Sequence, residues 1–423
     1  WQSAPPARGK GDKGAPRSVP LQLVELVAAQ GADLFRSTGD SIFAKVEGCS
    51  FELYSKDFEM AVRRWYRKEC GETISDTALR QALATLSAEA YERPKREVFV
   101  RVGHTADGKV YLDLGQHGNA RAVEVVPGKG WRIVDKPGCE FVRPPTQQPL
   151  PEPVHGGDFG RLWDYVNVTP SRRPLVAGYL LTSICPRLGT YFALVLSGSG
   201  GVGKTTACNT IRGVFDPDEV GLESPPDDPK KLNLQAENTW ICGFDNLDRA
   251  QPWFSDALCR ISTGGGSRER ELYYNKRCVV FKARRPILLN GIEEVPARGD
   301  LLSRSLLVSL DPIRKKKGAK RLPRLFEAAH PGILGALLDA LAGALPVLDV
   351  EPPDEFEAET RDPDLDLLIA AGEERLGFPC GAFRDAYRRQ ATVSSAIPLD
   401  SSPVTKPLLR FLADCEQERG PDE

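Results

Sequence analysis

Apolar and polar positions alternate with two different periods along the chain, and these periods divide it into regions. Helical spacing predicts helices at Lys56–Glu69 and Ser75–Ala90. Four short alternating runs follow, separated by turn residues, and they predict an antiparallel meander. The runs are Val98–Val102, Val110–Leu114, Ala122–Val126 and Trp131–Val134. We therefore expect an α+β domain over residues 19–142. A tail rich in Gly, Pro, Lys and Arg precedes it at 1–18, and its composition is typical of disorder.

Proline marks two further boundaries. Residues 143–157 contain five prolines followed by two glycines, which is typical of a stiff linker. Residues 350–364 are acidic and contain proline, and they predict a second linker. Between them an α/β pattern fills residues 158–349. Its last apolar stretch, Ile333–Leu345, predicts a helix that closes this domain as a lid. Residues 365–423 have a mostly helical pattern.

One apolar run in the α/β region leads directly into a glycine-rich sequence. Phe192–Ser197 is short and apolar, which is typical of a buried parallel strand. It continues into Gly198-Ser-Gly-Gly-Val-Gly203-Lys204-Thr205, and a helical pattern starts at Thr206. A strand, the pattern GxxxxGK[ST] and a helix in this order predict a phosphate-binding P-loop. The alternative is a plain glycine-rich turn.

The residue types of this loop suit a nucleotide. Glycines let the backbone approach the phosphates, and consecutive N–H groups at a helix N-terminus hold the anionic oxygens. Lys204 would bring positive charge to the β- and γ-phosphates, and the Thr205 hydroxyl would help to hold Mg²⁺. We therefore expect ATP and Mg²⁺ as cofactors. The residues assigned to nucleotide binding are Gly198, Ser199, Gly200, Gly201, Val202, Gly203, Lys204, Thr205 and Thr206.

Two later apolar runs each end in a polar residue that suits the same site. Thr239–Phe244 is followed by Asp245, which would reach the Mg²⁺ directly or through water. The acid that usually comes next to polarise the attacking water is replaced by Asn246, so the identity of the catalytic base stays open. The run Pro286–Asn290 ends in an amide that can orient water against the γ-phosphate. Asp245 and Asn290 could instead be a cap and a turn residue.

A single arginine, Arg304, stands among apolar residues in the run Asp300–Val308. Its burial would cost free energy without an anionic partner. The γ-phosphate bound to a neighbouring subunit would be such a partner, and Arg304 would then act as an arginine finger. An intramolecular ion pair is the alternative, and Arg298 is a competing finger candidate. The residues assigned to catalysis are Lys204, Asp245, Asn290 and Arg304, and those assigned to the metal are Thr205 and Asp245.

Taken in order, these motifs resemble those of a known family. After the P-loop and Phe244-Asp245-Asn246 come Ser255–Gly266, Arg270–Tyr273 and Arg285–Ile292. Their order and spacing over roughly residues 155–345 resemble the helicase module of phage- and plasmid-type primase–helicases, a viral-type superfamily-three AAA+ ATPase. The resemblance implies a homo-oligomer, a hexameric ring, that moves along single-stranded DNA with ATP. It also implies a role in the replication of a phage or mobile genetic element.

The resemblance further implies a DNA-contacting hairpin at Arg270–Phe281. Independently, Glu271–Tyr274 and Cys278–Phe281 are β-prone runs joined by Asn275-Lys276-Arg277. A projecting basic tip could follow a phosphate backbone. The residues expected at the DNA are Arg270, Lys276 and Arg277. A solvated basic face or a subunit contact is the alternative.

Composition limits the remaining choices. The net charge of −2 means that any DNA contact must come from local basic patches. Ten cysteines without a CxxC pair, and four histidines, argue against a zinc site and for reduced thiols in a cytoplasmic protein. No run of 18 apolar residues exists, so we expect no membrane partner.

The C-terminal pattern at Phe383–Leu412 is compatible with a winged-helix domain or with a simple helical cap. The expected fold class is therefore α/β: a P-loop AAA+ ATPase core with an N-terminal α+β domain and a C-terminal helical, winged-helix-like domain. The function we expect is that of a DNA-translocating, helicase-like ATPase. Two alternatives stay open: an ATP-switched regulatory or assembly ATPase that binds a protein partner, and a nucleotide-binding protein with little hydrolysis, which Asn246 suggests.

Overall fold

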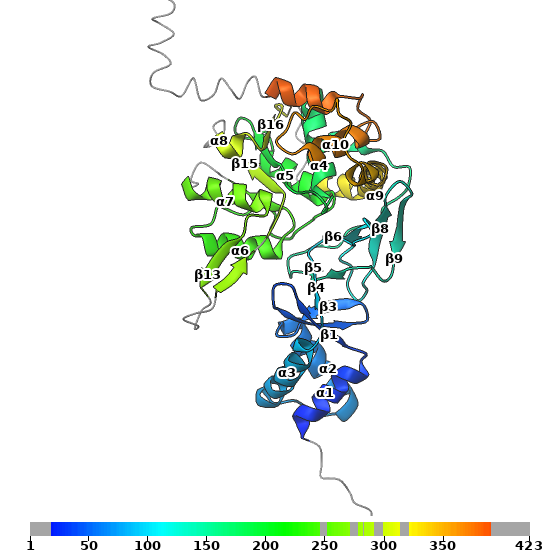
Figure 1. Ribbon diagram of the computed structural model, residues 1–423, viewed down its shortest axis with the longest axis vertical. Coiled ribbons are helices and arrows are strands. Elements are labelled where there is room, and N and C mark those ends of the chain that lie inside the picture. The colour runs from blue at the N-terminus through cyan, green and yellow to red at the C-terminus, as the bar shows by residue number, and fades with distance from the viewer. Residues whose placement is uncertain are drawn as a thin grey trace, which may run out of the picture. The chain divides into compact units, whose positions relative to one another are not determined.

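The computed structural model describes residues 18–245, 252–270, 278–281, 283–291, 299–313 and 321–390 (Figure 1). The chain divides into two compact units, Trp1–Val98 and Phe99–Glu423. The sequence predicted a domain boundary at residue 142, after the meander. In the structure the meander belongs to the second unit.

The first unit packs three helices on a small sheet. Its elements in chain order are α1 (Val19–Ala29), β1 (Asp33–Ser37), β2 (Ile42–Val46), β3 (Cys49–Glu52), α2 (Lys56–Cys70), α3 (Asp76–Tyr91) and β4 (Lys95–Arg96). The sheet order is β3-β2-β1-β4, antiparallel except for β1 and β4. Both helices predicted from the periodicity are confirmed to within one residue. Ser55 and Ser75 fix where they begin, because their hydroxyls accept hydrogen bonds from the N–H groups of Phe58 and Ala78.

The second unit begins with the meander. Its strands are β5 (Val98–Phe99), β6 (Val102–His104), β7 (Val110–Asp113), β8 (Ala122–Val126), β9 (Gly130–Val134) and β10 (Glu140–Phe141). The antiparallel order β6-β7-β8-β9 confirms the predicted meander, whereas β5 pairs with β10. The first predicted run is split because Arg101 has a left-handed φ of 62°. Its side chain is fully buried and donates hydrogen bonds to Asp216 (3.2 Å) and to the carbonyl of Gln148 (2.7 Å).

A four-stranded parallel sheet forms the centre of this unit. Its strands are β11 (Ala193–Ser197), β12 (Cys242–Phe244), β15 (Ile287–Asn290) and β16 (Ser305–Ser309), in the order β12-β15-β11-β16. The helices of the unit are α4 (Arg173–Ser183), α5 (Lys204–Gly213), α6 (Pro229–Asn238), α7 (Pro252–Thr263), α8 (Gly299–Leu302), α9 (Arg321–Ala344) and α10 (Pro363–Gly372). Short 3₁₀ turns lie at η1 (Phe159–Asp164), η2 (Pro170–Arg172) and η4 (Leu345–Asp349).

Helices cover both faces of the parallel sheet, which explains why its strands are apolar throughout. Leu194 and Leu196 of β11 join the core cluster that contains residues of α4, α5 and α9. The alternate residues Ala193 and Val195 join a second cluster with residues of α6 and α7. The second unit is therefore a three-layer α/β structure with a parallel sheet, as the α/β fold class predicted.

Helix α9 extends well before the predicted lid helix, Ile333–Leu345. It is long and apolar enough to cross a membrane by length and composition, but most of that window is buried within the protein, as in a core helix. The proline-rich segment 143–157, predicted to be a linker, packs against it. The Val154 N–H donates to the carbonyl of Pro331, and a Cβ on Gly335 would lie only 1.9 Å from the carbonyl oxygen of Val154. This close approach explains the glycine.

The described part of the C-terminal region is helical and covers the edge of the parallel sheet. The Gln390 amide accepts from the N–H of Leu307 (2.7 Å) and donates to the carbonyl of Ser305 (2.7 Å), so it pairs with the free edge of β16. This contact fits the helical-cap alternative. Most of the predicted winged-helix segment, from residue 391 onward, lies outside the described residues.

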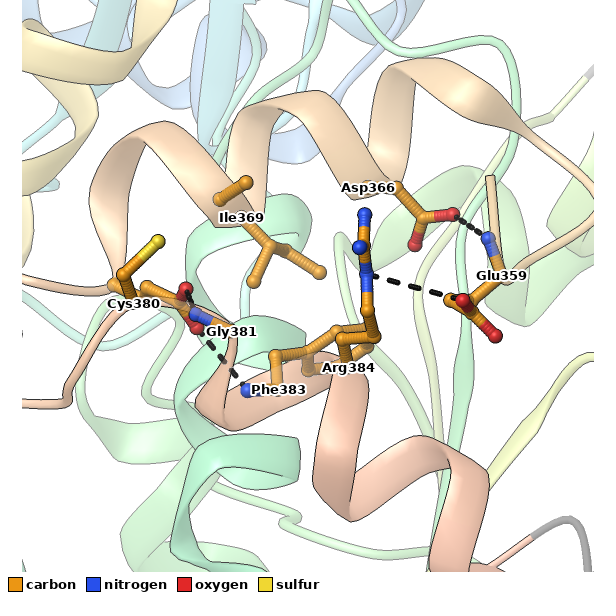
Figure 2. Close-up of a pocket in the computed structure, with 9 residues that line it drawn as sticks. Glu359, Asp366, Ile369, Cys380, Gly381, Phe383 and Arg384 are labelled. Carbon is orange, nitrogen blue, oxygen red and sulfur yellow. Dashed lines mark hydrogen bonds and ion pairs between the residues drawn. The ribbon is translucent and has the colours of Figure 1, made fainter. Parts of the chain in front are cut away.

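A small cavity of about 140 Å³ lies in this helical region. Figure 2 shows Asp366 accepting from the Glu359 N–H and Arg384 reaching toward the Glu359 carboxylate. The buried Glu373 carboxylate accepts from the N–H of Phe383 (3.1 Å). These carboxylates hold backbone N–H groups at turns and helix starts, which is a structural role.

Candidate nucleotide-binding site

Three polar side chains from different segments meet where the parallel strands end, at what we call the carboxyl edge of the sheet. The Asn290 amide nitrogen lies 2.7 Å from Asp245 Oδ1 and 3.1 Å from the Thr205 hydroxyl. The Thr205 hydroxyl lies 3.1 Å from Asp245 Oδ2. Each pair of the three is therefore joined by a hydrogen bond, although the residues are 40 to 85 positions apart in the sequence.

The order of the strands explains this meeting. The amide strand β15 lies between the P-loop strand β11 and the acid strand β12, and all three are parallel. Leu196 is aligned with Asn290, and Phe244 is aligned with Leu289. Asp245 therefore follows β12 at the level of Asn290. Asn290 is buried, with 3% of its surface exposed, and its Oδ1 has no hydrogen-bond partner among the described residues.

The P-loop joins β11 to α5 through left-handed glycines. Gly198 has φ 149° and Gly203, which precedes α5, has φ 79°, a conformation that side chains rarely adopt. Lys204 folds back over the loop, and its ammonium donates to the carbonyls of Gly198 (2.7 Å) and Ser199 (3.3 Å).

The start of α5 fits an anionic group. No side chain of the described residues caps its first turn. The first N–H groups of a helix have no partner within it, and the helix dipole adds partial positive charge at this end. These N–H groups, the Lys204 ammonium, the exposed Thr205 hydroxyl and the unpartnered Asn290 Oδ1 converge on one region. A nucleotide phosphate would accept from the N–H groups and the ammonium, and its magnesium ion would take the Thr205 hydroxyl oxygen as a ligand.

Sequence reasoning missed residues that flank this loop. The Asn167 amide donates to the carbonyl of Val202 in the loop (3.1 Å) and to that of Asp311. Glu223 lies beside β12, where its N–H donates to the Gly243 carbonyl and its own carbonyl accepts from the Asp245 N–H (2.8 Å). Burial raises the pKa of the Glu223 carboxyl. Neither residue belongs to a sequence motif. Packing of distant segments brings both to the site, so the sequence pattern gives no signal for them.

Arg304 lies at the opposite, amino edge of the sheet, where the strands begin. Its carbonyl accepts from the N–H of Ala193, the first residue of β11, and the P-loop begins only after the last residue, Ser197. A strand rises about 3.3 Å per residue, so β11 separates the two edges by roughly 13 Å. The structure does not bring Arg304 to the P-loop of its own chain. Its Nε is buried without a hydrogen-bond partner among the described residues.

Only the two ends of the expected DNA hairpin, Arg270–Phe281, lie within the described residues. Strands β13 (Ser267–Arg270) and β14 (Cys278–Phe281) pair antiparallel, with Arg270 opposite Cys278. The described pairing begins at Ser267, whereas the predicted first run, Glu271–Tyr274, lies outside the described residues. The predicted contacts Lys276 and Arg277 lie outside the described residues, as do Asn246 and Arg298.

Comparison with known protein families finds a match in the central part of the chain. Residues 161–360 match the model of a family described as the actinomycete integrative conjugative element replication protein. No curated protein sequence matches the chain significantly. The expected resemblance to a replication module of mobile elements is confirmed.

Solved structures give more distant similarities. The C-terminal region of NrS-1 aligns with a TM-score of 0.44 at 13% identity, covering 75% of this chain and 69% of that one. The structure described as SCCmec type IV Cch, active helicase, aligns with a TM-score of 0.48 at 12% identity, covering 92% and 78%. We transfer no function from similarities of this size.

Proposed function

We propose that the second unit is a helicase-like ATPase that translocates along DNA during the replication of a mobile genetic element. The observation that carries the proposal is the contact of Thr205, Asp245 and Asn290 with one another beside the P-loop. The match of residues 161–360 to a replication protein family supports the biological setting.

The residues of the site take distinct roles. Thr205 and Asp245 would hold Mg²⁺, which neutralises phosphate charge when it is bound. Lys204 exchanges its bonds to loop carbonyls for bonds to phosphate oxygens, so its charge stays compensated with and without nucleotide. The free Oδ1 of Asn290 accepts a hydrogen bond from a water molecule beside the γ-phosphate and orients it for attack.

Arg304 would act on the nucleotide of a neighbouring subunit. Its position at the amino edge is too far from its own P-loop for a side chain to span. No ion pair or side-chain hydrogen bond joins Arg304 to another residue in the part of the chain that the structure describes, and a γ-phosphate bound to a neighbouring subunit would supply an anionic partner. This reading requires a ring of subunits, which we propose to be a hexamer.

The expected DNA ligand is a single strand. The hairpin of β13 and β14 would carry Arg270, Lys276 and Arg277 to the phosphate backbone, and ATP-driven movement of neighbouring subunits would shift the strand. This part of the proposal rests on the resemblance stated from the motifs.

Turnover of ATP with and without single-stranded DNA tests the proposal. We expect DNA to stimulate hydrolysis, particles of six subunits when ATP and DNA are present, and loss of turnover in Lys204→Ala at unchanged thermal stability. Basal hydrolysis without stimulation or assembly would instead favour a regulatory ATPase with a protein partner. No turnover above background would favour a nucleotide-binding protein with little hydrolysis.

A further inference from the structure

Helix α2 of the first unit presents a row of exposed cations that has no part in the site described above. Lys56, Arg64 and Lys68 are spaced eight and four residues apart, so they lie on one face of the helix. Arg67 lies beside them on the next turn. All four side chains are exposed, and the row extends over about 18 Å at 1.5 Å per residue. We call these four residues the α2 ridge.

The ridge cations have no partners within the part of the chain that the structure describes: no ion pair or hydrogen bond joins the side chains of the four to another group. Arg63 on the same helix provides the contrast. Its guanidinium donates to Asp76 (2.5 Å) and to the carbonyl of Ile74 (2.9 Å), so it joins α2 to the start of α3. Arg63 therefore joins two elements of the fold through side-chain hydrogen bonds, which the ridge residues do not; Arg67 and Lys68 lie in the last turn of α2, where their charge also suits the helix dipole.

The acids of α2 do not neutralise the ridge. Asp57 lies on the ridge face, at about 100° from Lys56 around the helix, so it offsets one of the four positive charges. Glu59 lies about 60° from Lys56 on the other side, in the first turn, where a carboxylate also interacts favourably with the helix dipole. Glu69 is thirteen residues after Lys56, and at 100° per residue it lies on the far side of the helix from the ridge. The outward face is therefore locally basic, although the protein as a whole is slightly acidic.

The opposite face of α2 is used by the fold. Phe58, Val62 and Tyr66 are buried in the core of the first unit together with residues of α1 and α3. A basic amphipathic helix binds a membrane surface by inserting its apolar face, and here that face is already occupied. The ridge thus offers charge alone, which suits a polyanion with regularly spaced charges at its surface.

An exposed aromatic residue stands at one end of the ridge. Tyr54 precedes the capping residue Ser55 and has 57% of its surface exposed. Tyrosines beside cations stack on unpaired bases in single-strand binders. Its position next to Lys56 adds a second, independent feature that points to nucleic acid.

We propose that the α2 ridge of the first unit is a DNA-binding surface, separate from the ATPase sheet, which holds the phosphate backbone through Lys56, Arg64, Arg67 and Lys68. Tyr54 stacks on a base where the DNA is single-stranded. This inference goes beyond the proposed function, since the binding needs neither ATP nor hydrolysis.

The test uses the full chain without nucleotide and measures binding of a fluorescent oligonucleotide, single-stranded or duplex, over a range of salt concentrations. For the variant Arg64→Glu/Arg67→Glu/Lys68→Glu we expect at least about a tenfold loss of affinity at low salt. The slope of log K against log salt should become shallower by roughly 0.7 per lost contact on single strands and 0.9 on duplex. Tyr54→Ala should weaken single-strand binding alone.

Matched controls separate this surface from general charge effects. Arg80→Glu makes the same change as Arg64→Glu on an exposed arginine of the neighbouring helix α3, and it should leave binding unchanged. Basal ATP turnover and the melting temperature should stay unchanged in all ridge variants.

Each failure can be told apart. If the triple variant bound DNA as tightly as Arg80→Glu, the ridge proposal would be overturned even with DNA-stimulated turnover intact. If the wild-type chain bound DNA through the ridge while DNA left its ATP turnover unstimulated, the ridge would stand while the proposed function failed. Ridge-dependent binding to phosphatidylserine vesicles but not to DNA would also overturn the proposal.

Discussion

The two edges of the parallel sheet collect polar residues in opposite ways. At the carboxyl edge, Thr205, Asp245 and Asn290 contact one another, and the group left over is an acceptor, Asn290 Oδ1. At the amino edge, two arginines differ in whether their side chains have hydrogen-bond partners. Arg285 is satisfied within the chain, whereas the group left over on Arg304 is a donor, its Nε.

Arg285 shows what a structural arginine looks like in this fold. Its Nε donates to the carbonyls of Ala236 (2.9 Å) and Thr239 (2.8 Å), and its guanidinium lies 5.2 Å from the ring centroid of Trp240. Arg304 stands at the same edge without such bonds to its Nε. The two arginines therefore differ in that the fold supplies hydrogen-bond acceptors to the Arg285 guanidinium, whereas no acceptor among the described residues meets the Arg304 Nε. Substitutions at four positions test this difference between the two edges.

The largest effect is expected from Arg304→Ala. Loss of an arginine finger lowers turnover by about a thousandfold, while the fold should persist because the fold does not satisfy the Arg304 Nε. Mixing this variant with Lys204→Ala should restore part of the turnover, since each chain supplies what the other lacks. Co-assembled mixtures without any recovery would mean that Arg304 acts within its own subunit or not at all.

Asn290→Ala should come next. Removing the amide that contacts both Thr205 and Asp245 should lower turnover by about a hundredfold, as for other single hydrogen-bonding groups of a catalytic site, with ATP affinity nearly unchanged. Asn238→Ala, which removes an exposed amide at the end of α6, is the matched control and should have full activity. Equal turnover in the two variants would remove Asn290 from the mechanism.

Arg285→Leu should act on stability rather than on chemistry. Two buried carbonyls lose their charged donor, which should lower the free energy of unfolding by about 2 kcal/mol in denaturant titrations. Arg304→Leu should cost less, because no bond to its Nε is lost. If Arg304→Leu were the more destabilising of the two, the distinction between the arginines would be wrong.

The smallest effect concerns His330, which joins α9 to the end of α5, the helix that runs between the two edges. Its Nε2 lies 2.8 Å from the carbonyl of Val214 and burial lowers its pKa. Because the folded-state pKa lies below the unfolded value near 6.5, the unfolded chain takes up the proton first. Stability should therefore fall as pH drops below about 6.5.

The melting temperature from pH 7.5 to pH 5 measures this effect. His330→Gln should fall less steeply than the wild type over this range, because glutamine can donate to the same carbonyl without titrating. The exposed His117→Gln serves as control and should follow the wild type. Parallel curves for His330→Gln and the wild type would exclude a contribution from His330.

The local elements and the chemistry of the loop could be predicted from the amino-acid pattern alone. Helices α2 and α3 followed from their apolar spacing, and the P-loop followed from its glycines, Lys204 and Thr205. Asp245 and Asn290 could be assigned to one site because parallel strands end at a common edge. This assignment requires only that both runs form buried strands. Such features depend on residues close together in the chain.

Strand order, the unit to which the meander belongs and the pairing register became known from the tertiary structure, because they depend on contacts between distant residues. The structure placed β15 between β11 and β12, so that Asn290 contacts both Thr205 and Asp245. It assigned the meander to the second unit, where the buried Arg101 bonds Asp216 across 115 positions of sequence. It set the register of the β13–β14 pair and left the Arg304 Nε without a partner. The physical reason is that packing and hydrogen bonding between distant segments select one arrangement among several that satisfy the same local pattern.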